Sequence, residues 1–480
     1  MDPRPKPKLF ALTWPLLAEL LLGMGVGLVG LALAARTSDS ASAAFALSGH
    51  VLNAFFLLFR IVSMGVSVVV TQNLGAGNAA GAERTARAAI GASTWSGLLV
   101  AGIVLLSGGA LLDLLNAPAD VRAAGEPFLL ALAPALLLDA YNASFSAVLR
   151  AHLRTREAMF NVLAMHSLHL ALCVPLMHGI GSIPALGLPG FALALGLSRL
   201  VGLAVHLWLW QRSLGLAPRW RDAWAIDRPT LRPVLHIGLP GAAEAIAYRL
   251  SMLASLAVVA TFGTASLATH GYTSQLTNLV VLVSVSLGFA GEILIGHQVG
   301  AGRLREADRT LRRSLGIALA ASVAGAIAMA LAGPWVLGLF THDPAIVASA
   351  AALLWVNVAL EPGRTCNVVV INALRAAGDA RFPVQAGAAS MLVVMAGGSW
   401  LFGAHLGWGL VGVWLAYTLD EWVRGIMMVL RWRSLRWTHH ARASRRRVAH
   451  KTPATSAFPP PNESEAALPA ADRVPWEETR

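Results

Sequence analysis

The sequence predicts an all-α polytopic membrane protein, with twelve transmembrane helices arranged as two pseudo-symmetric six-helix lobes. Three observations lead to this prediction. Of the 480 residues, 56% are hydrophobic and only 13% are charged, whereas a soluble domain carries about 25% charged residues. The apolar residues gather in long runs, and the two halves of the chain match at a constant offset. This composition excludes a soluble globular enzyme, a disordered chain and a disulfide scaffold.

The apolar runs are long enough to cross a bilayer as helices, which takes about 20 residues each. The first run is longer than the apolar region of a signal peptide, about 7–15 residues, so we expect a retained helix. Strands of a membrane barrel are shorter and alternate polar with apolar residues, and these runs do not alternate. The predicted spans are 9–35, 44–73, 88–112, 123–149, 158–180, 187–210, 234–260, 265–298, 314–340, 345–374, 383–405 and 408–430.

The positive charges divide the connections between spans into two kinds. Among the connections, those that follow odd-numbered spans carry only the arginines Arg36 and Arg122, and those that follow even-numbered spans carry the other loop arginines. By the positive-inside rule, both termini are cytoplasmic, and we expect a protein of the inner membrane. The predicted parts are a cytoplasmic N-terminus 1–8, an N-lobe 9–210, a cytoplasmic linker 211–233, a C-lobe 234–432 and a cytoplasmic tail 433–480 that is first basic and then disordered.

The formal net charge is +12, which in a soluble protein would suggest nucleic-acid binding. Here the excess lies in the predicted cytoplasmic loops and tail, where it sets topology and meets anionic lipid headgroups. We therefore expect the lipid bilayer as a partner and no nucleic acid. Cys173 and Cys366 both lie in apolar runs, where cysteine behaves as a small hydrophobe, so no disulfide is predicted.

The chain contains an internal repeat. A shift of 225 residues places Pro15 on Pro240 and Glu19 on Glu244, and it matches further residues along both halves. Six spans in each half return the chain to the side where it started, so the repeats are related by an axis along the membrane normal. Secondary transporters of this design bind near the midplane between the halves. Channels and membrane enzymes can be duplicated too, so the repeat favours a transporter without excluding them. Other matches are Asn53 with Asn278, Gly75 with Gly300, Asn142 with Asn367, Arg150 with Arg375 and Arg156 with Arg381.

Several of these matched segments resemble signatures of the multidrug and toxic compound extrusion (MATE) family. They are residues 71–77 (TQNLGAG) and 296–302 (GHQVGAG), and residues 361–364 (EPGR) continuing to 373–383 (ALRAAGDARFP). The resemblance covers roughly residues 8–435. It implies two six-helix lobes in a V and cation-driven export of small organic compounds. A phosphate-binding loop is excluded for residues 75–77, because no strand precedes them and no Gly-Lys-Ser/Thr follows.

Ionisable residues inside membrane spans are costly and are functional candidates. Glu244 and Glu361 lie near the middle of their spans, as do Asp139 and Glu19, and Glu244 has no base three or four residues away. A carboxyl group without a full partner in low dielectric takes up a proton more readily than one in water. The family resemblance implies an acidic residue of the span 234–260 in the cation site. We therefore predict cation coupling at Glu244, Glu361, Asp139 and Glu19.

We predict that polar residues of several spans line a substrate cavity. The alternative for each of them is a hydrogen bond between helices. Arg364 follows Glu361 by three residues, so the two side chains share a helix face and can pair. The pair acts either in transport or only as a structural ion pair. His166 and His169 have a spacing that metals use, but no acid or cysteine completes a site, so neither a metal nor a cofactor is predicted. The cavity residues are Asn53, Asn278, Gln275, Tyr248, Arg364 and Asn357.

The first span departs from the family pattern. Many prokaryotic MATE relatives have an aspartate in its second half, where this chain has residues 27–31 (GLVGL). Either coupling resides in the C-lobe alone, or Glu19 and Asp139 replace that aspartate.

The predicted function is a monomeric antiporter, not an enzyme, that exports cationic or amphipathic organic compounds in exchange for H⁺ or Na⁺. One alternative is a flippase for lipids or lipid-linked oligosaccharides, which needs cationic cavity residues and would use Arg60, Arg199 and Arg364. The other is a membrane-embedded transferase, which needs catalytic acids or histidines in its loops. The loops here are short and carry mainly arginine.

Overall fold

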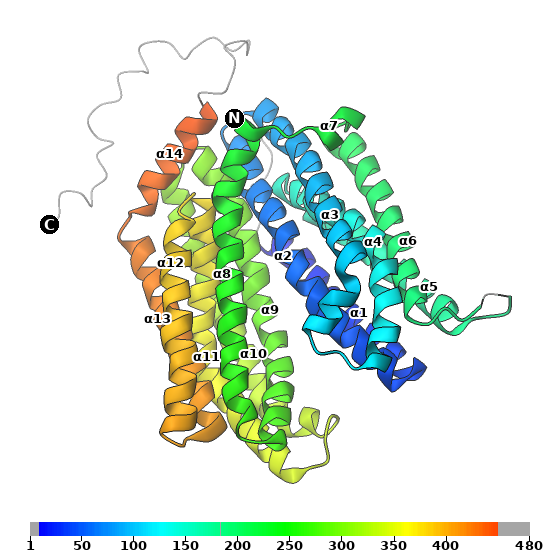
Figure 1. Cartoon of the computed structure of the whole chain (residues 1–480). Helices are drawn as coiled ribbons and strands as arrows, with labels where there is room; N and C mark the ends of the chain where they lie inside the picture. The colour runs from blue at the N-terminus through cyan, green and yellow to red at the C-terminus, as the bar shows by residue number, and fades with distance from the viewer. Residues whose placement is uncertain (1–8, 183, 450–480) are drawn as a thin grey trace, which may run out of the picture.

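The computed structural model describes residues 9–182 and 184–449. Within these ranges the chain forms two groups of long helices that lie side by side (Figure 1). This architecture confirms the predicted all-α membrane fold. The predicted N-terminus 1–8 and the predicted disorder beyond residue 449 lie outside the described residues.

The first group is the N-lobe, and each of its helices matches one predicted span. Its last helix continues as a short π-helix, and a short α-helix follows in the linker. These elements are α1 (Leu9–Thr37), α2 (Asp39–Gly75), α3 (Ala79–Leu114), α4 (Ala119–Ala151), α5 (Thr155–His178), α6 (Leu188–Leu209), η1 (Trp210–Leu214) and α7 (Trp220–Trp224).

The second group is the C-lobe, in which the predicted span 383–405 is one α-helix that continues in π-helical geometry. The elements are α8 (Arg228–Ala260), α9 (Thr264–Gly300), α10 (Leu304–Leu337), α11 (Pro344–Ala376), α12 (Arg381–Ser390), η2 (Met391–Gly397), η3 (Ser399–His405), α13 (Gly409–Arg433) and α14 (Trp437–Ala449).

Eleven helices of the described chain are long and apolar enough to cross a membrane. The twelfth predicted span corresponds to α13, which carries Asp420, Glu421 and Arg424 in its middle. These three charges make α13 more polar than the other spans, although its flanking residues are apolar. The cluster they form inside the C-lobe is described below.

The ends of α2 and α9 have the same local structure for the same reason. Gly77 and Gly302 follow them with φ of +74° and +75°, a conformation that glycine adopts without steric cost. Asn78 then accepts a hydrogen bond from the Gly81 amide at 2.9 Å and caps α3. The matched GAG segments are thus sharp turns between antiparallel helices.

The basic stretch after residue 433, predicted only as part of the cytoplasmic tail, forms a helix in the structure. Residues Trp437–Ala449 form α14, whose Trp437 is 1% exposed and stacks on Trp432 with ring centroids 4.0 Å apart. Burial of large aromatic surface fixes this helix against the end of α13. In Figure 1, α14 lies at the same end of the molecule as the first described residues and α7; this end is called the terminal end below.

Candidate functional site

The two lobes meet where α2 crosses α9, and this crossing follows the repeat. Ser67 donates a hydrogen bond of 3.3 Å to Glu292, and a separation of 225 residues makes these two each other's repeat equivalents. Thr71 and Gly296 are also equivalents, and the Thr71 hydroxyl occupies the place of a side chain on Gly296. Residues that contact their own equivalents lie on the pseudo-two-fold axis, so the axis passes through this crossing.

Pairs of equivalent contacts flank the axis. A Cβ atom on Gly75 would overlap the backbone carbonyl of His297, and one on Gly300 would overlap that of Gln72. Gln72 Nε2 donates to the Ala376 carbonyl at 2.8 Å, and His297 Nε2 pairs with the equivalent Ala151 carbonyl at 2.8 Å. The helices approach to backbone contact here, so the lobes are sealed at the terminal end.

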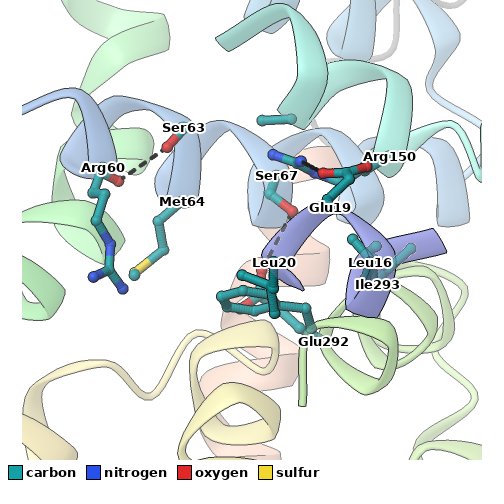
Figure 2. Close-up of a pocket in the computed structure, with 12 residues that line it drawn as sticks. Leu16, Glu19, Leu20, Arg60, Ser63, Met64, Ser67, Arg150, Glu292 and Ile293 are labelled. Carbon is teal, nitrogen blue, oxygen red and sulfur yellow. Dashed lines mark hydrogen bonds and ion pairs between the residues drawn. The ribbon is translucent and has the colours of Figure 1, made fainter. Parts of the chain in front are cut away.

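A cavity of about 240 Å³ opens between the lobes next to this seal. Figure 2 shows Ser67 and Glu292 joined on one side of it, and the pair of Glu19 and Arg150 on another. Glu292 is 5% exposed. The cavity therefore has a polar floor at the axis, and its walls combine apolar side chains with Arg60 and the Glu19–Arg150 pair. Its lining residues are Leu16, Glu19, Leu20, Arg60, Ser63, Met64, Ser67, Ala147, Arg150, Phe289, Glu292 and Ile293.

Each lobe holds one glutamate–arginine pair at equivalent positions. Glu19 of α1 accepts a hydrogen bond of 2.8 Å from Arg150 of α4, and Glu244 of α8 pairs with Arg375 of α11. The expectation that Glu244 lacks a full partner is wrong. That expectation considered only bases one turn away on the same helix, whereas Arg375 comes from 131 residues further along the chain.

Asp139 also has a partner inside the N-lobe. Arg199 of α6 donates to Asp139 of α4 at 2.6 Å, and both side chains are nearly buried, at 12% and 10% exposure. The pair lies within one lobe and does not line the cavity between lobes. Of the three arginines considered for a flippase, Arg199 is thus neutralised by an adjacent carboxylate.

The largest charged cluster lies inside the C-lobe and is called the C-lobe cluster below. It contains three carboxylates, from Glu361, Asp420 and Glu421, and two guanidinium groups, from Arg364 and Arg424. Arg424 contacts Asp420 at 2.6 Å and Glu421 at 2.9 Å, and Arg364 reaches Glu361 at 3.4 Å. With three acids and two bases, full ionisation leaves one negative charge without compensation in a buried site, which is costly unless a cation joins it.

Several side chains of this region have buried hydrogen-bonding atoms without hydrogen-bond partners in the described chain. Among them are Oε1 of Glu361 and both amide atoms of Asn357. The two residues are 0% and 1% exposed, and a spacing of four places them on one face of α11. Buried polar atoms normally have partners, so this face has free ligands for a water molecule, a proton or a cation with oxygen ligands.

The remaining predicted cavity residues lie elsewhere. Tyr248 is 40% exposed, and Asn53, Gln275 and Asn278 are exposed as well. None of these four lines the cavity next to the seal. Conversely, the cavity contains Ser67 and Glu292, which were not among the predicted site residues. Comparing matched positions for different residue types, as well as identical ones, would have revealed this pair.

The duplicated six-helix lobes, the seal on the axis and the buried acids are features of membrane transporters built from two parallel repeats. The MatE family model matches residues 15–174 and 240–400, one match in each lobe. The chain therefore belongs to the MATE family of membrane transporters.

Known relatives agree over nearly the whole chain. The uncharacterized transporter YisQ of Bacillus subtilis is 32% identical over 429 residues, covering 89% of this chain and 94% of the relative. The probable multidrug resistance protein NorM of Bradyrhizobium diazoefficiens is 28% identical, covering 84% and 88%. The solved structure described as MATE in the bent conformation has a TM-score of 0.83 and 19% identity, covering 91% and 96%. At that identity, the solved structure supports the fold alone.

Proposed function

We propose that the protein is a secondary active antiporter that exports amphipathic organic compounds in exchange for H⁺ or Na⁺. The observation that supports this proposal best is the C-lobe cluster, with three carboxylates against two guanidinium groups. One bound proton or one Na⁺ compensates the excess negative charge of the cluster, and loss of that cation leaves the charge uncompensated. A site of this kind gains or loses one cation as it faces solutions of different composition, which is the requirement for coupling.

Alternating access supplies the rest of the mechanism. The lobes are sealed at the terminal end through α2, α8 and α9, and their ribbons draw apart toward the other end (Figure 1). With cytoplasmic termini, as the arginine distribution favours, this state faces outward. Cation binding at Glu361 would favour substrate release there, and cation loss to the cytoplasm would follow the rearrangement. We propose this cycle for a monomer in the inner membrane, with no cofactor besides the coupling ion.

The names of relatives support the export of toxic compounds. NorM of Bradyrhizobium diazoefficiens is named a probable multidrug resistance protein, and PmpM of Pseudomonas aeruginosa a multidrug resistance protein. The most similar of the relatives described above is a transporter of uncharacterized substrate, so the range of compounds is part of the proposal.

The test is transport in proteoliposomes with imposed pH or Na⁺ gradients, comparing the unmodified protein with Glu361→Gln and Glu244→Gln. We expect Glu361→Gln to retain substrate exchange across the membrane but to lose acceleration by either gradient. Glu126→Gln, which alters an exposed carboxylate near the start of α4, is the matched control. Gradient-driven transport that is unchanged in Glu361→Gln would refute coupling at the C-lobe cluster.

The flippase alternative loses two of its three arginines. Arg199 is paired with Asp139, and Arg364 with Glu361 and Glu421. Arg60 alone remains without an acidic partner in the described chain, and it lines the cavity. Loss of a cell-envelope glycan on deletion, without a drug phenotype, would favour the flippase. A transferase has no comparable support, since the relatives are transporters.

A further inference from the structure

Two arginines inside the membrane-spanning part of the lobes have no carboxylate partner within the described chain. Arg60 of α2 and Arg249 of α8 are both exposed, and neither takes part in an ion pair there. The other three arginines that line the cavity or belong to the C-lobe cluster do have partners: Arg150, Arg364 and Arg424. An unpaired guanidinium at this depth is expensive and indicates a functional role.

The two unpaired arginines lie on the two helices of the α2–α8 seam, close enough for the charge of Arg249 to act on Arg60. Below them the seam is closed by backbone contact, because a Cβ atom on Gly238 would overlap the Ile61 carbonyl. Gly241 lies against the Met64 side chain, and Arg60 is one helical turn further from the terminal end than Met64. Arg60 thus stands at the point where the lobes begin to part.

The charges nearest to Arg60 include two other arginines and one glutamate. The charged groups that act on it are Arg375, Glu244 and Arg249. Glu244 is already paired with Arg375, so no carboxylate remains for Arg60 and Arg249. In Figure 2 the Arg60 side chain extends away from the Glu19–Arg150 pair, and only its backbone carbonyl has a marked partner.

The second seam, between α1 and α9, has the opposite character. The repeat equivalent of Arg60 is Val285, and that of Arg249 is Met24. The cavity wall on this side is mostly apolar side chains of α1 and α9, together with Glu19, which is paired with Arg150, and the nearly buried Glu292, which is bonded to Ser67. One seam therefore carries unpaired arginines and the other, in the part of the chain that the structure describes, carries none, although the repeat makes their backbones equivalent. The apolar wall residues are Leu16, Leu20, Phe289 and Ile293.

We propose that the cavity binds an amphiphile with an anionic headgroup, a carboxylate or a phosphate, at Arg60, with the charge of Arg249 nearby outside the cavity lining, and holds its apolar body against the apolar side chains of the α1–α9 seam. This proposal rests on the proposed transport function and specifies its substrate class. Guanidinium groups bind carboxylates and phosphates through two parallel hydrogen bonds. An anion also supplies a countercharge for these two unpaired arginines.

The test compares two probes that differ only in headgroup charge: a dansyl-labelled fatty acid and the dansyl-labelled alkylamine of the same chain length. Binding to the full chain in phosphatidylcholine nanodiscs is followed by dansyl fluorescence. We expect the fatty acid to bind at least about tenfold more tightly than the amine. Arg60→Gln with Arg249→Gln should remove this preference, while Arg442→Gln on α14 should keep it. Arg60→Met is a second, apolar replacement, in case the glutamine variant folds poorly.

Tighter binding of the amine, or an unchanged preference in both arginine variants, would overturn the proposal. Gradient-driven transport of a cationic dye that is unaffected by Arg60→Gln would also overturn it while leaving the antiport function intact. Conversely, arginine-dependent binding of the fatty acid without any gradient-driven transport would support the substrate class and refute the antiport. Adding phosphatidylglycerol to the nanodiscs distinguishes a lipid headgroup from a water-soluble anion as the natural ligand. If the lipid displaces the probe, the ligand is a membrane lipid. If it does not, the ligand is a water-soluble anion.

Discussion

Replacing Gly75 or Gly300 by alanine should destabilise the sealed state of the lobes. Each new Cβ atom would overlap a backbone carbonyl of the opposite lobe, that of His297 or of Gln72, and a backbone cannot swing away as a side chain does. Forcing a methyl group into such a contact costs about 1–3 kcal/mol. The cost arises only where α2 and α9 touch, so it shifts the balance between sealed and open terminal ends about 5–150-fold.

The shift can be measured with spin labels at Ala117 and His342, which are repeat equivalents in the connections at the far end of the two lobes. Both native cysteines, Cys173 and Cys366, are first replaced. Opening of the terminal end should bring the far ends together, so the distance distribution between the labels should move to shorter values in both glycine variants.

Gly316→Ala is the matched control, because a Cβ atom there meets nothing within 4 Å. It should leave the distance distribution unchanged. If Gly75→Ala and Gly300→Ala also leave it unchanged, the close crossing of α2 and α9 is not what holds the terminal end shut.

Three further changes test other contacts. Glu19→Gln should lower the free energy of unfolding by about 3 kcal/mol, because it leaves the largely buried Arg150 without its acid. Adding Arg150→Gln to this variant should restore the stability measured in a thermal melt. Ser67→Ala should shift the spin-label distances in the same direction as the glycine variants by about 1 kcal/mol; no shift would mean that its bond to Glu292 does not help the seal. Trp437→Ala should cost about 3 kcal/mol and expose α14 to trypsin, and unaltered cleavage would count against its docking.

The helix order, the lobes and the sharp turns were all predictable from the sequence, because apolar runs, arginine-rich loops and matched glycines are local signals. The partners of the acids were not. Glu19 with Arg150 and Glu244 with Arg375 each span 131 residues, and no helical spacing relates them. The repeat indicates the pairing, because the glutamates of the two pairs match each other, and so do the arginines, at the offset that relates the two halves.

The unpaired arginines illustrate a second limit. Arg60 and Arg249 could be recognised in the sequence as charges inside spans. In the structure Arg199 is paired with an acid of another helix, and Arg364 with acids of its own helix and of another, whereas Arg60 and Arg249 have no such partner in the described chain. Which arginine keeps a free charge depends on packing between helices that are distant in sequence. The excess negative charge of the C-lobe cluster likewise appears only when α11 and α13 are brought together.

The contact between Thr71 and Gly296 shows what fusion of two repeats permits. In a symmetric dimer of separate halves, a residue on the axis faces an identical copy of itself. Two threonines would collide at this point, and two glycines would leave a gap. Joining the halves in one chain lifts this restriction, so a large residue can face a small one, and Ser67 can face Glu292. Positions on the axis are therefore where the two halves of a duplicated chain can first differ in residue type. A protein that moves its cargo in one direction needs such a difference between its halves.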